Sequence, residues 1–266
     1  MKHISSRDNP LYKRVARLAD GKRVADERGR PGYPVLLEGV HLCQEWLRLH
    51  GNPDMALFDA QRLTQNPELL SLADAVSPAF AVTCETQLIK ALSQVGHGQG
   101  VYFMVLAPVP LMPERIDHNC LWLDRVQDPG NVGTLLRTAA AAGIAHAYLS
   151  PGCASAWSAK VVRSAQGAHF SMAIHENVDL HKARELLAVP LLATALDDAG
   201  SLFETVLPPH CAWLFGNEGQ GADPALLAAA DSRVFIPQST YVESLNVAVA
   251  AGICLFEQRR VHATQA

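Results

Sequence analysis

Residues 121–138 read LWLDRVQDPGNVGTLLRT, and this stretch carries three structural signals in succession. It begins with a short apolar run, which predicts a buried strand. Pro129 and Gly130 then predict a sharp turn, and Asn131 is expected to cap the helix that follows. Gly133 leaves the first helical turn open to close approach, and Arg137 lies one turn further along. The stretch therefore predicts a strand, a loop and a helix, which is the repeating unit of an α/β fold.

Two more loops of unusual composition follow apolar runs. The sequence FGNEGQG at 215–221 contains three glycines, which permit positive φ angles and bare backbone contact with a ligand. It matches neither the dinucleotide-binding fingerprint nor a phosphate-binding loop. The sequence IPQSTYVESLNV at 236–247 opens the last helix, for which Ser244 is the expected N-cap. Helix capping explains Ser244, but it does not explain Asn246 or the strand end at Ile236 and Pro237. This loop is therefore also a candidate binding site.

Apolar runs alternate with helical stretches along most of the chain. The runs occupy residues 35–37, 55–58, 80–82 and 101–106, and then 121–123, 145–149, 191–195, 213–215 and 234–236. A final helix is expected from about residue 245 to about residue 260. This alternation predicts α/β domains with largely parallel sheets. In such sheets ligands bind in the loops beyond the carboxyl ends of the strands, which is where the three unusual loops are expected to lie.

A dense group of prolines marks the joint between two domains. Pro108, Pro110 and Pro113 follow an apolar run, and prolines this close together can continue neither a helix nor a central strand. We therefore expect a first domain at 1–107, a proline-rich linker at 108–117 and a second domain at 118–266.

The composition excludes several classes of protein. The chain has 266 residues, of which 49% are apolar and 18% charged, so low-complexity, collagen-like and disordered proteins are excluded. No apolar run is long enough for a membrane helix, and no apolar core follows the basic N-terminus, so neither a membrane span nor a signal peptide is expected. The six cysteines are widely separated and include no C-x-x-C pair, and no cluster has metal-ligand spacing. These features predict a cytoplasmic protein without a metal.

Positive charge is concentrated at the N-terminus. Residues 1–30 contain nine lysines and arginines against four acidic residues, whereas the whole chain has a net charge of −4. This gradient is typical of a protein that presents one basic face to a polyanion, although a solvated helix followed by a mobile basic loop would give the same pattern. The candidate contacts are Lys2, Arg7, Lys13, Arg14, Arg17, Lys22 and Arg23.

Together the three loops resemble the motifs of the SpoU family of RNA methyltransferases, which belongs to the knotted SPOUT superfamily. The matching residues are Asn131, Gly133 and Arg137 in the first motif, Gly216, Glu218, Gly219 and Gly221 in the second, and Ile236, Pro237, Ser244, Leu245 and Asn246 in the third. The N-terminal part, with Asn9-Pro10 and Leu37-Glu38-Gly39, is similar to the family's ribosomal-protein-like RNA-binding domain. One departure is Thr240, where many members carry glycine.

The resemblance implies a fold and a reaction. The expected fold is a C-terminal parallel-sheet α/β/α domain with a deep trefoil knot, preceded by a small ribosomal-protein-like α/β domain. The expected reaction is methylation of a ribose 2′-hydroxyl in RNA with S-adenosylmethionine as donor. The domain layout favours 23S rRNA as the substrate, and the family forms homodimers in which the partner's first motif completes each site.

The resemblance also assigns roles to residues. The cofactor would bind at Leu196, Gly216, Asn217, Gly221, Ile236, Ser244, Leu245 and Asn246. The catalytic set would be Asn131, Arg137, Glu218, Ser244 and Asn246. Arg137 is also expected to contact RNA, because an arginine is protonated at neutral pH and suits a phosphate anchor better than a general base.

Other functions stay open at this point. A tRNA 2′-O-methyltransferase and a base methyltransferase of the same superfamily share the fold and the cofactor. A non-catalytic RNA-binding or ribosome-assembly protein would keep the basic N-terminus but would not need Asn131, Arg137, Glu218 and Asn246 together. Another nucleotide-dependent α/β enzyme would explain the glycine-rich loop but not the Ser244-Leu245-Asn246 sequence.

Overall fold

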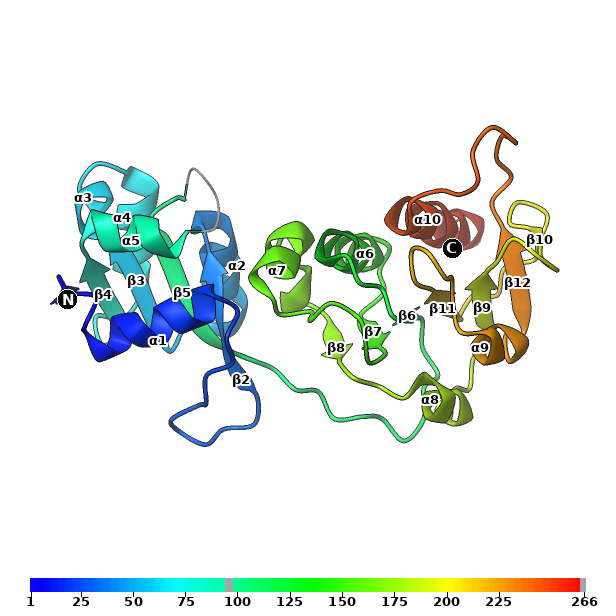
Figure 1. Ribbon diagram of the computed structural model, residues 1–266, viewed down its shortest axis with the longest axis horizontal. Coiled ribbons are helices and arrows are strands. Elements are labelled where there is room, and N and C mark those ends of the chain that lie inside the picture. Colours follow the sequence, from blue (N-terminus) through cyan, green and yellow to red (C-terminus); the bar gives the residue numbers. More distant parts are fainter. Residues whose placement is uncertain (94–97, 264–266) are drawn as a thin grey trace. The chain divides into compact units, whose positions relative to one another are not determined.

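The structure, a computed structural model, describes residues 1–93 and 98–263. Its contacts divide the chain into two compact units, each with its own sheet (Figure 1). The first unit contains Met1–Val109 and the short segment Trp157–Arg163, and the second contains Pro110–Ala156 and the chain from Ser164 onward. The proline-rich segment 108–117 contains no helix, and a single backbone bridge joins its Ile116 to Leu187. The domain boundaries at 107 and 118 stay a prediction.

The first unit alternates strands with helices, as its apolar runs predict. Its elements are β1 (Lys2–Ile4), α1 (Pro10–Ala19), β2 (Tyr33–Glu38), α2 (Val40–His50), β3 (Met55–Asp59), α3 (Ala60–Leu63), α4 (Pro67–Ala75), β4 (Ala81–Cys84), α5 (Thr86–Leu92) and β5 (Val101–Ala107). The strand order is β1-β4-β3-β5-β2, and the first three of these strands run parallel. β5 is antiparallel to both of its neighbours. The sheet is therefore mixed, and the expectation of a largely parallel sheet fails at β5 alone, because the alternation of apolar runs does not encode the direction in which a strand enters the sheet.

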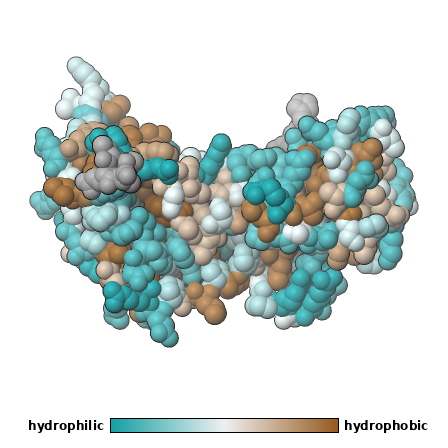
Figure 2. Space-filling model, turned by 180° about the vertical axis from the view of Figure 1, so that it is seen from behind, coloured by the Kyte–Doolittle hydropathy of each residue, from teal (hydrophilic) through white to brown (hydrophobic). Residues whose placement is uncertain are grey.

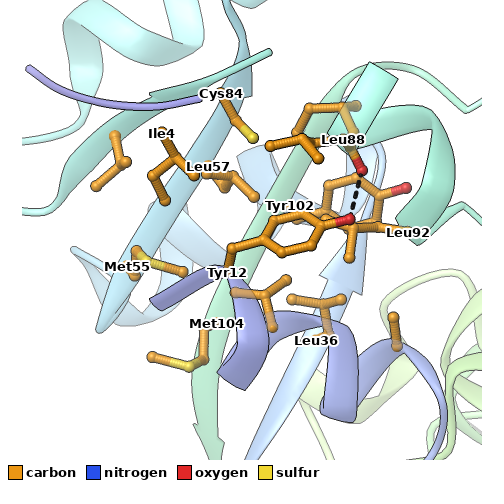
Figure 3. Close-up of a cluster of buried hydrophobic side chains, with 14 of the residues drawn as sticks. Ile4, Tyr12, Leu36, Met55, Leu57, Cys84, Leu88, Leu92, Tyr102 and Met104 are labelled. Carbon is orange, nitrogen blue, oxygen red and sulfur yellow. Dashed lines mark hydrogen bonds between the residues drawn. The ribbon is translucent and has the colours of Figure 1, made fainter. Parts of the chain in front are cut away.

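Helix α1 shows how the local sequence builds this unit. Asn9 caps the helix by accepting hydrogen bonds from the amides of Leu11 and Tyr12, and Pro10 occupies the first helical position. The apolar face of α1 packs into a core built from all five strands and α5 (Figure 3). Within this core the Tyr12 hydroxyl donates a hydrogen bond to the carbonyl of Leu88 at 3.0 Å. The opposite face of α1 is left to carry charged side chains.

The second unit contains a seven-stranded sheet. Its elements are β6 (Cys120–Leu123), α6 (Pro129–Ala141), β7 (His146–Leu149), the 3-10 helix Ala168–Phe170, β8 (Ala173–His175), α8 (Leu180–Leu186), β9 (Leu191–Thr194), β10 (Gly200–Ser201), β11 (Ala212–Phe215), α9 (Pro224–Ala228), β12 (Ser232–Phe235) and α10 (Val247–Ala263). Helix α7 (Ala159–Ala165) follows β7 in the chain, but most of it lies in the segment Trp157–Arg163, which belongs to the first unit. The strand order is β10-β12-β9-β11-β6-β7-β8, and every pairing is parallel. The sequence did not predict β8 and β10, or β1 in the first unit, because these strands are too short to give an apolar run.

Parallel pairing places the carboxyl ends of neighbouring strands at one edge of the sheet. The loops after β6, β9, β11 and β12 therefore share that edge. Helix α10 packs against α6, which brings the end of the chain back to the helix that follows the first loop. The side chain of Gln258 in α10 accepts a hydrogen bond from the buried indole of Trp213 in β11 at 2.8 Å and so holds the helix on the sheet.

Figure 2 shows polar side chains over much of the visible surface, with hydrophobic residues in scattered patches. Within residues 1–93 and 98–263, no helix combines the length and the apolar character needed to cross a membrane.

Candidate functional site

A cavity of about 660 Å³ lies at the carboxyl edge of the second sheet. Its walls come from the segments after β9, β11 and β12 and from the start of α10. The structure brings together here all eight residues that the sequence analysis placed around a cofactor: Leu196, Gly216, Asn217, Gly221, Ile236, Ser244, Leu245 and Asn246. Glu218 also lines the cavity. Volumes of a few hundred to a thousand cubic ångströms are typical of sites for small organic ligands.

Glu218 joins the second loop to the first. Its carboxylate accepts hydrogen bonds from the amides of Gln127 and Asp128 at 3.2 and 3.1 Å and from the side-chain amide of Asn131 at 3.0 Å. Partial burial by itself raises the pKa of this carboxyl. The hydrogen bonds from Asn131 and the backbone outweigh that effect and hold the pKa below its usual value. Glu218 is therefore an anion at neutral pH, and its oxygens are occupied in fastening the two loops.

Asn131 continues the connection to the third loop. Its side-chain oxygen accepts a hydrogen bond from Nδ2 of Asn246 at 2.9 Å, although the two residues lie far apart in the sequence. The side-chain oxygen of Asn246 in turn accepts from the amides of Ala248 and Val249 at 2.9 and 3.3 Å. Glu218, Asn131 and Asn246 thus form one hydrogen-bonded chain that ends on the first turn of α10. We call it the Glu218–Asn131–Asn246 chain.

Two predicted helix caps are corrected by this geometry. The side chain of Asp128, and not that of Asn131, caps α6 by accepting from the amide of Asn131 at 2.9 Å. Asn246, and not Ser244, takes the capping position of α10. In both cases the helix begins two or three residues away from the expected place, because the side chain that reaches the free amides depends on how the loop enters the helix.

Asn217 shapes the glycine-rich loop from within. Its backbone exchanges two hydrogen bonds with Gly221, at 3.0 and 2.9 Å, and its side-chain oxygen accepts from the amides of Gly219 and Gln220. Its side-chain nitrogen donates to the carbonyl of Arg125 at 2.8 Å, which adds a second link to the first loop. The loop is therefore a closed turn that is held to its neighbour at two points.

Gly216, the first glycine of this loop, is required by the packing of the loop against its own backbone. A Cβ atom on Gly216 would lie 2.0 Å from the backbone nitrogen of Ala222. Gly221 has a φ of +70°, a conformation that disfavours residues with a Cβ. The interpretation of these glycines as places of bare contact with a ligand is therefore incomplete, because close approach of the chain to itself already requires Gly216.

Asp124 is a buried polar residue that the sequence analysis did not assign. Its carboxylate accepts from the guanidinium of Arg125, from the hydroxyl of Ser150 at 3.0 Å and from the amide of Asp223 at 2.8 Å. It thereby ties the start of the first loop to the end of the second. The available signal was an acidic residue directly after a buried strand, where a carboxylate needs several donors to be stable.

Arg137 lies away from this arrangement. It is exposed on α6, it does not line the cavity, and within the described part of the chain it forms no ion pair. One chain by itself thus assembles Asn131, Glu218, Ser244 and Asn246 at or beside the cavity but leaves the predicted arginine outside. The polar cavity-lining residues Asp197, Arg233, Gln238 and Glu243 were not predicted.

The basic N-terminal residues fall into two groups. The first group forms ion pairs within the same stretch. Lys13 pairs with Asp8 at 2.8 Å, Arg14 with Glu27 at 2.9 Å, Lys22 with Asp20 at 3.4 Å, and Arg30 with Asp26. Lys2, Arg7 and Arg17 are exposed and have no carboxylate partner among the described residues, and the guanidinium of Arg23 lies 4.6 Å from the ring centre of Tyr33. The second group is the part of the stretch whose charge is not neutralised locally.

Comparisons with known proteins give concordant results. The sequence model of the SpoU rRNA methylase family matches residues 118–256. The chain is 34% identical to the 23S rRNA guanosine 2′-O-methyltransferase RlmP of Bacillus subtilis, over 97% of this chain and 100% of that protein. It is also 34% identical to RlmB of Nitrosomonas europaea, named a 23S rRNA guanosine 2′-O-methyltransferase, over 84% of this chain and 90% of that protein.

Solved structures agree in fold over nearly the whole chain. An RNA 2′-O-ribose methyltransferase superposes with a TM-score of 0.79 at 27% identity and covers 98% of this chain and 99% of its own. An rRNA methyltransferase from Sinorhizobium meliloti, solved with AdoMet bound, gives a TM-score of 0.79 at 25% identity and covers 98% of both chains.

Proposed function

Because the chain belongs to the SpoU rRNA methylase family, we propose that it transfers a methyl group from S-adenosylmethionine to a ribose 2′-hydroxyl of 23S rRNA. The observation that carries this proposal is the Glu218–Asn131–Asn246 chain, which fastens the first loop to the two loops that line the cavity after β11 and β12. The close relatives named as 23S rRNA 2′-O-methyltransferases support the choice of substrate. The proposal includes a cytoplasmic location.

The residues around the cavity fit this cofactor. Leu196, Ile236 and Leu245 supply apolar surface of the kind that covers a purine, and the backbone of the glycine-rich loop supplies polar groups. Asn217, Ser244 and Asn246 add side chains that can bind hydroxyl, amino and carboxylate groups. When bound, S-adenosylmethionine supplies an electrophilic methyl group on a sulfonium.

The residues of this chain would align the acceptor and help to remove its proton. An in-line approach of the ribose oxygen requires a rigid site, and the hydrogen-bonded loops supply that rigidity before RNA arrives. Because all the donors around Glu218 are already bound to its carboxylate, this residue orders the loops and is a poor candidate for the base. Asn131 and Asn246 each use one N–H of the side-chain amide in the Glu218–Asn131–Asn246 chain, and the second N–H of each, with the hydroxyl of Ser244, would offer polar groups for the ribose.

Arg137 would act from a second copy of the chain. We assign it to the phosphate beside the target ribose, where its charge also stabilises the developing alkoxide. Its position outside the cavity of its own chain supports a homodimer in which each arginine completes the other subunit's site. The proposal also includes the deep trefoil knot of the second domain, the ribosomal-protein-like fold of the first and the contact of its basic residues with RNA.

The first test is calorimetric titration of S-adenosylmethionine and its demethylated product into the wild type, Asn246→Ala and Asn246→Asp. Asn246→Ala removes both the cap of α10 and the donor to Asn131, and we expect affinity to fall by at least about tenfold. Asn246→Asp keeps acceptors for the amides of Ala248 and Val249 but leaves Asn131 between two carboxylates. It should therefore lose affinity while keeping more thermal stability than the alanine variant.

Transfer of a labelled methyl group then identifies the substrate. We expect label in 23S rRNA and not in tRNA, recovered in an alkali-resistant dinucleotide because a methylated 2′-hydroxyl cannot assist cleavage of the neighbouring phosphate. Wild-type affinity in Asn246→Ala would contradict the assignment of the cavity. Label on a base would contradict the reaction, and label in tRNA would contradict the substrate.

A further inference from the structure

The loop between β12 and α10 (Figure 1) begins and ends at residues that line the cavity. Gln238 and Glu243 both line the cavity, and the side-chain nitrogen of Gln238 donates a hydrogen bond to the carbonyl of Glu243 at 3.1 Å. This bond closes a short loop of four residues, 239–242, whose two ends are fixed at the rim. Both ends of the loop are therefore anchored on residues that line the cavity.

Tyr241 projects from this loop into solvent. Its side chain is 96% exposed, and the neighbouring Val242 is 52% exposed. Within the described residues its ring stacks on no other ring and its hydroxyl makes no hydrogen bond. Two hydrogen bonds hold the backbone around it. The amide of Tyr241 donates to the hydroxyl of Ser239 at 3.3 Å, and the amide of Val242 donates to the carbonyl of Ser239 at 3.4 Å. The fold thus holds an aromatic ring in water without using it for packing.

The residues beside Tyr241 restrict the motion of the loop. Thr240 and Val242 are β-branched, which limits their side-chain and backbone freedom. A loop that is already restricted loses less conformational entropy when it is ordered against a ligand. This chain therefore presents its tyrosine on a stiffer support than a glycine-containing loop would give.

The ring lies within reach of a nucleotide bound at the cavity. Only two residues separate Tyr241 from Ser244, a cavity-lining residue, so their Cα atoms are at most about 11 Å apart. A ribose whose 2′-hydroxyl enters the cavity carries its base, and those of its neighbours, into the same region. Single-stranded RNA is commonly bound by stacking its bases on exposed aromatic side chains.

We propose that Tyr241 stacks on a nucleobase at or next to the target nucleotide and so positions the ribose over the cavity. This inference rests on the proposed function and names the part of the RNA that the loop recognises. Tyr241 is a positioning residue that acts on the substrate and not on the cofactor. Stacking uses the face of the base, so it holds the nucleotide without reading its hydrogen-bonding edge.

The test compares Tyr241→Ala and Tyr241→Phe with Phe203→Ala, which removes an exposed aromatic ring that does not line the cavity. For each full-length protein we would measure RNA affinity at several salt concentrations, affinity for S-adenosylmethionine, and molecular mass by light scattering. Tyr241→Ala should weaken RNA binding about tenfold and raise KM for RNA, with an unchanged slope against salt, because stacking releases no counterions. Tyr241→Phe should keep wild-type affinity, as should Phe203→Ala.

Each alternative has its own result. Unchanged RNA affinity in Tyr241→Ala would overturn the inference. A changed molecular mass of Tyr241→Ala would show that the ring packs against a second copy of the chain. A loss of cofactor affinity in Tyr241→Ala would show that the loop covers the cofactor. Each of these two results would also overturn the inference. Failure of the proposed function is distinguishable, because the wild type itself would then transfer no methyl group to RNA.

Discussion

The three loops of the second unit and the basic N-terminal stretch of the first hold their polar side chains in opposite ways. In the loops, Glu218 accepts three hydrogen bonds and Asn131 connects two other loops. In the stretch, Lys2, Arg7 and Arg17 are exposed and have no carboxylate partner among the described residues. The loops hold their polar groups in defined positions, whereas the N-terminal stretch only concentrates positive charge.

This difference follows from the two tasks. Alignment of a methyl donor with a ribose oxygen depends on tenths of an ångström, so the groups around it must be held before the substrate arrives. Attraction of a polyanion depends on charge within about a Debye length, ~8 Å at physiological salt, and tolerates mobile side chains. We therefore expect the loops to be sensitive to changes of shape and the stretch to be sensitive only to changes of charge.

The largest effect is expected from Gly216→Ala. Its added Cβ would lie 2.0 Å from the backbone of Ala222, so the glycine-rich loop must rearrange and the cavity must lose its shape. Gly219→Ala is the matched control, because the nearest atom to its added Cβ is the Asn217 side-chain oxygen at 3.7 Å. Calorimetric titration should show loss of S-adenosylmethionine binding in Gly216→Ala, and thermal unfolding should show a much smaller loss of stability in Gly219→Ala. Equal melting temperatures for the two variants would mean that the loop is not as tightly packed as described.

A smaller effect is expected when charge is removed from the stretch. The double variant Arg7→Ala/Arg17→Ala removes two cations that have no carboxylate partner in the part of the chain that the structure describes. The double variant Lys13→Ala/Lys22→Ala removes two cations that pair with Asp8 and Asp20. The first should weaken RNA binding and lower the slope of log affinity against log salt by about 1.4, at ~0.7 per phosphate contact on single-stranded RNA. The Lys13→Ala/Lys22→Ala variant should change the salt slope less. Fluorescence anisotropy measures RNA binding by each double variant at salt concentrations from about 50 to about 300 mM, and the two salt slopes are then compared. If both double variants behaved alike, local pairing would not select the cations that meet RNA.

The smallest effect is expected from moderate acid. Burial lowers the pKa of His169 to about 4, and burial together with His146 and His118 lowers that of His175 to about 4. Between pH 6.5 and pH 4 the unfolded chain binds protons that the folded chain does not, so stability falls as the pH is lowered through this range. At pH 5.5 the loss is about 1 kcal/mol for each histidine, which corresponds to a few degrees in melting temperature.

Thermal unfolding at pH 7.5, 6.5 and 5.5 measures this effect, and His175→Phe provides the control. The phenyl ring can keep the stacking on Tyr148, where the ring centres lie 4.6 Å apart, but it does not titrate. The variant should therefore lose less stability in acid than the wild type. A wild-type melting temperature that stays constant down to pH 5.5 would contradict the burial of these histidines as neutral groups.

Local sequence patterns predicted the elements of the fold well and their details less well. The apolar runs at 121–123 and 213–215 lie in β6 and β11, and the expected last helix is α10, Val247–Ala263. The caps at Asn131 and Ser244 were assigned to the wrong residues, because several polar side chains in each loop could reach the free amides. Asp124 went unassigned, since a single acid after a strand becomes informative only when its donors are known.

The sequence alone determined the succession of strands and helices, the three loops and the family, because these depend on residue types and spacings along the chain. The tertiary structure decided which side chains meet. It joins Asn131 to Asn246, sets β5 antiparallel to its neighbours and leaves Arg137 outside the cavity. The physical reason is that hydrogen bonds between distant residues depend on the register and packing of parallel strands and helices. These arise from burial over the whole unit and not from any one segment.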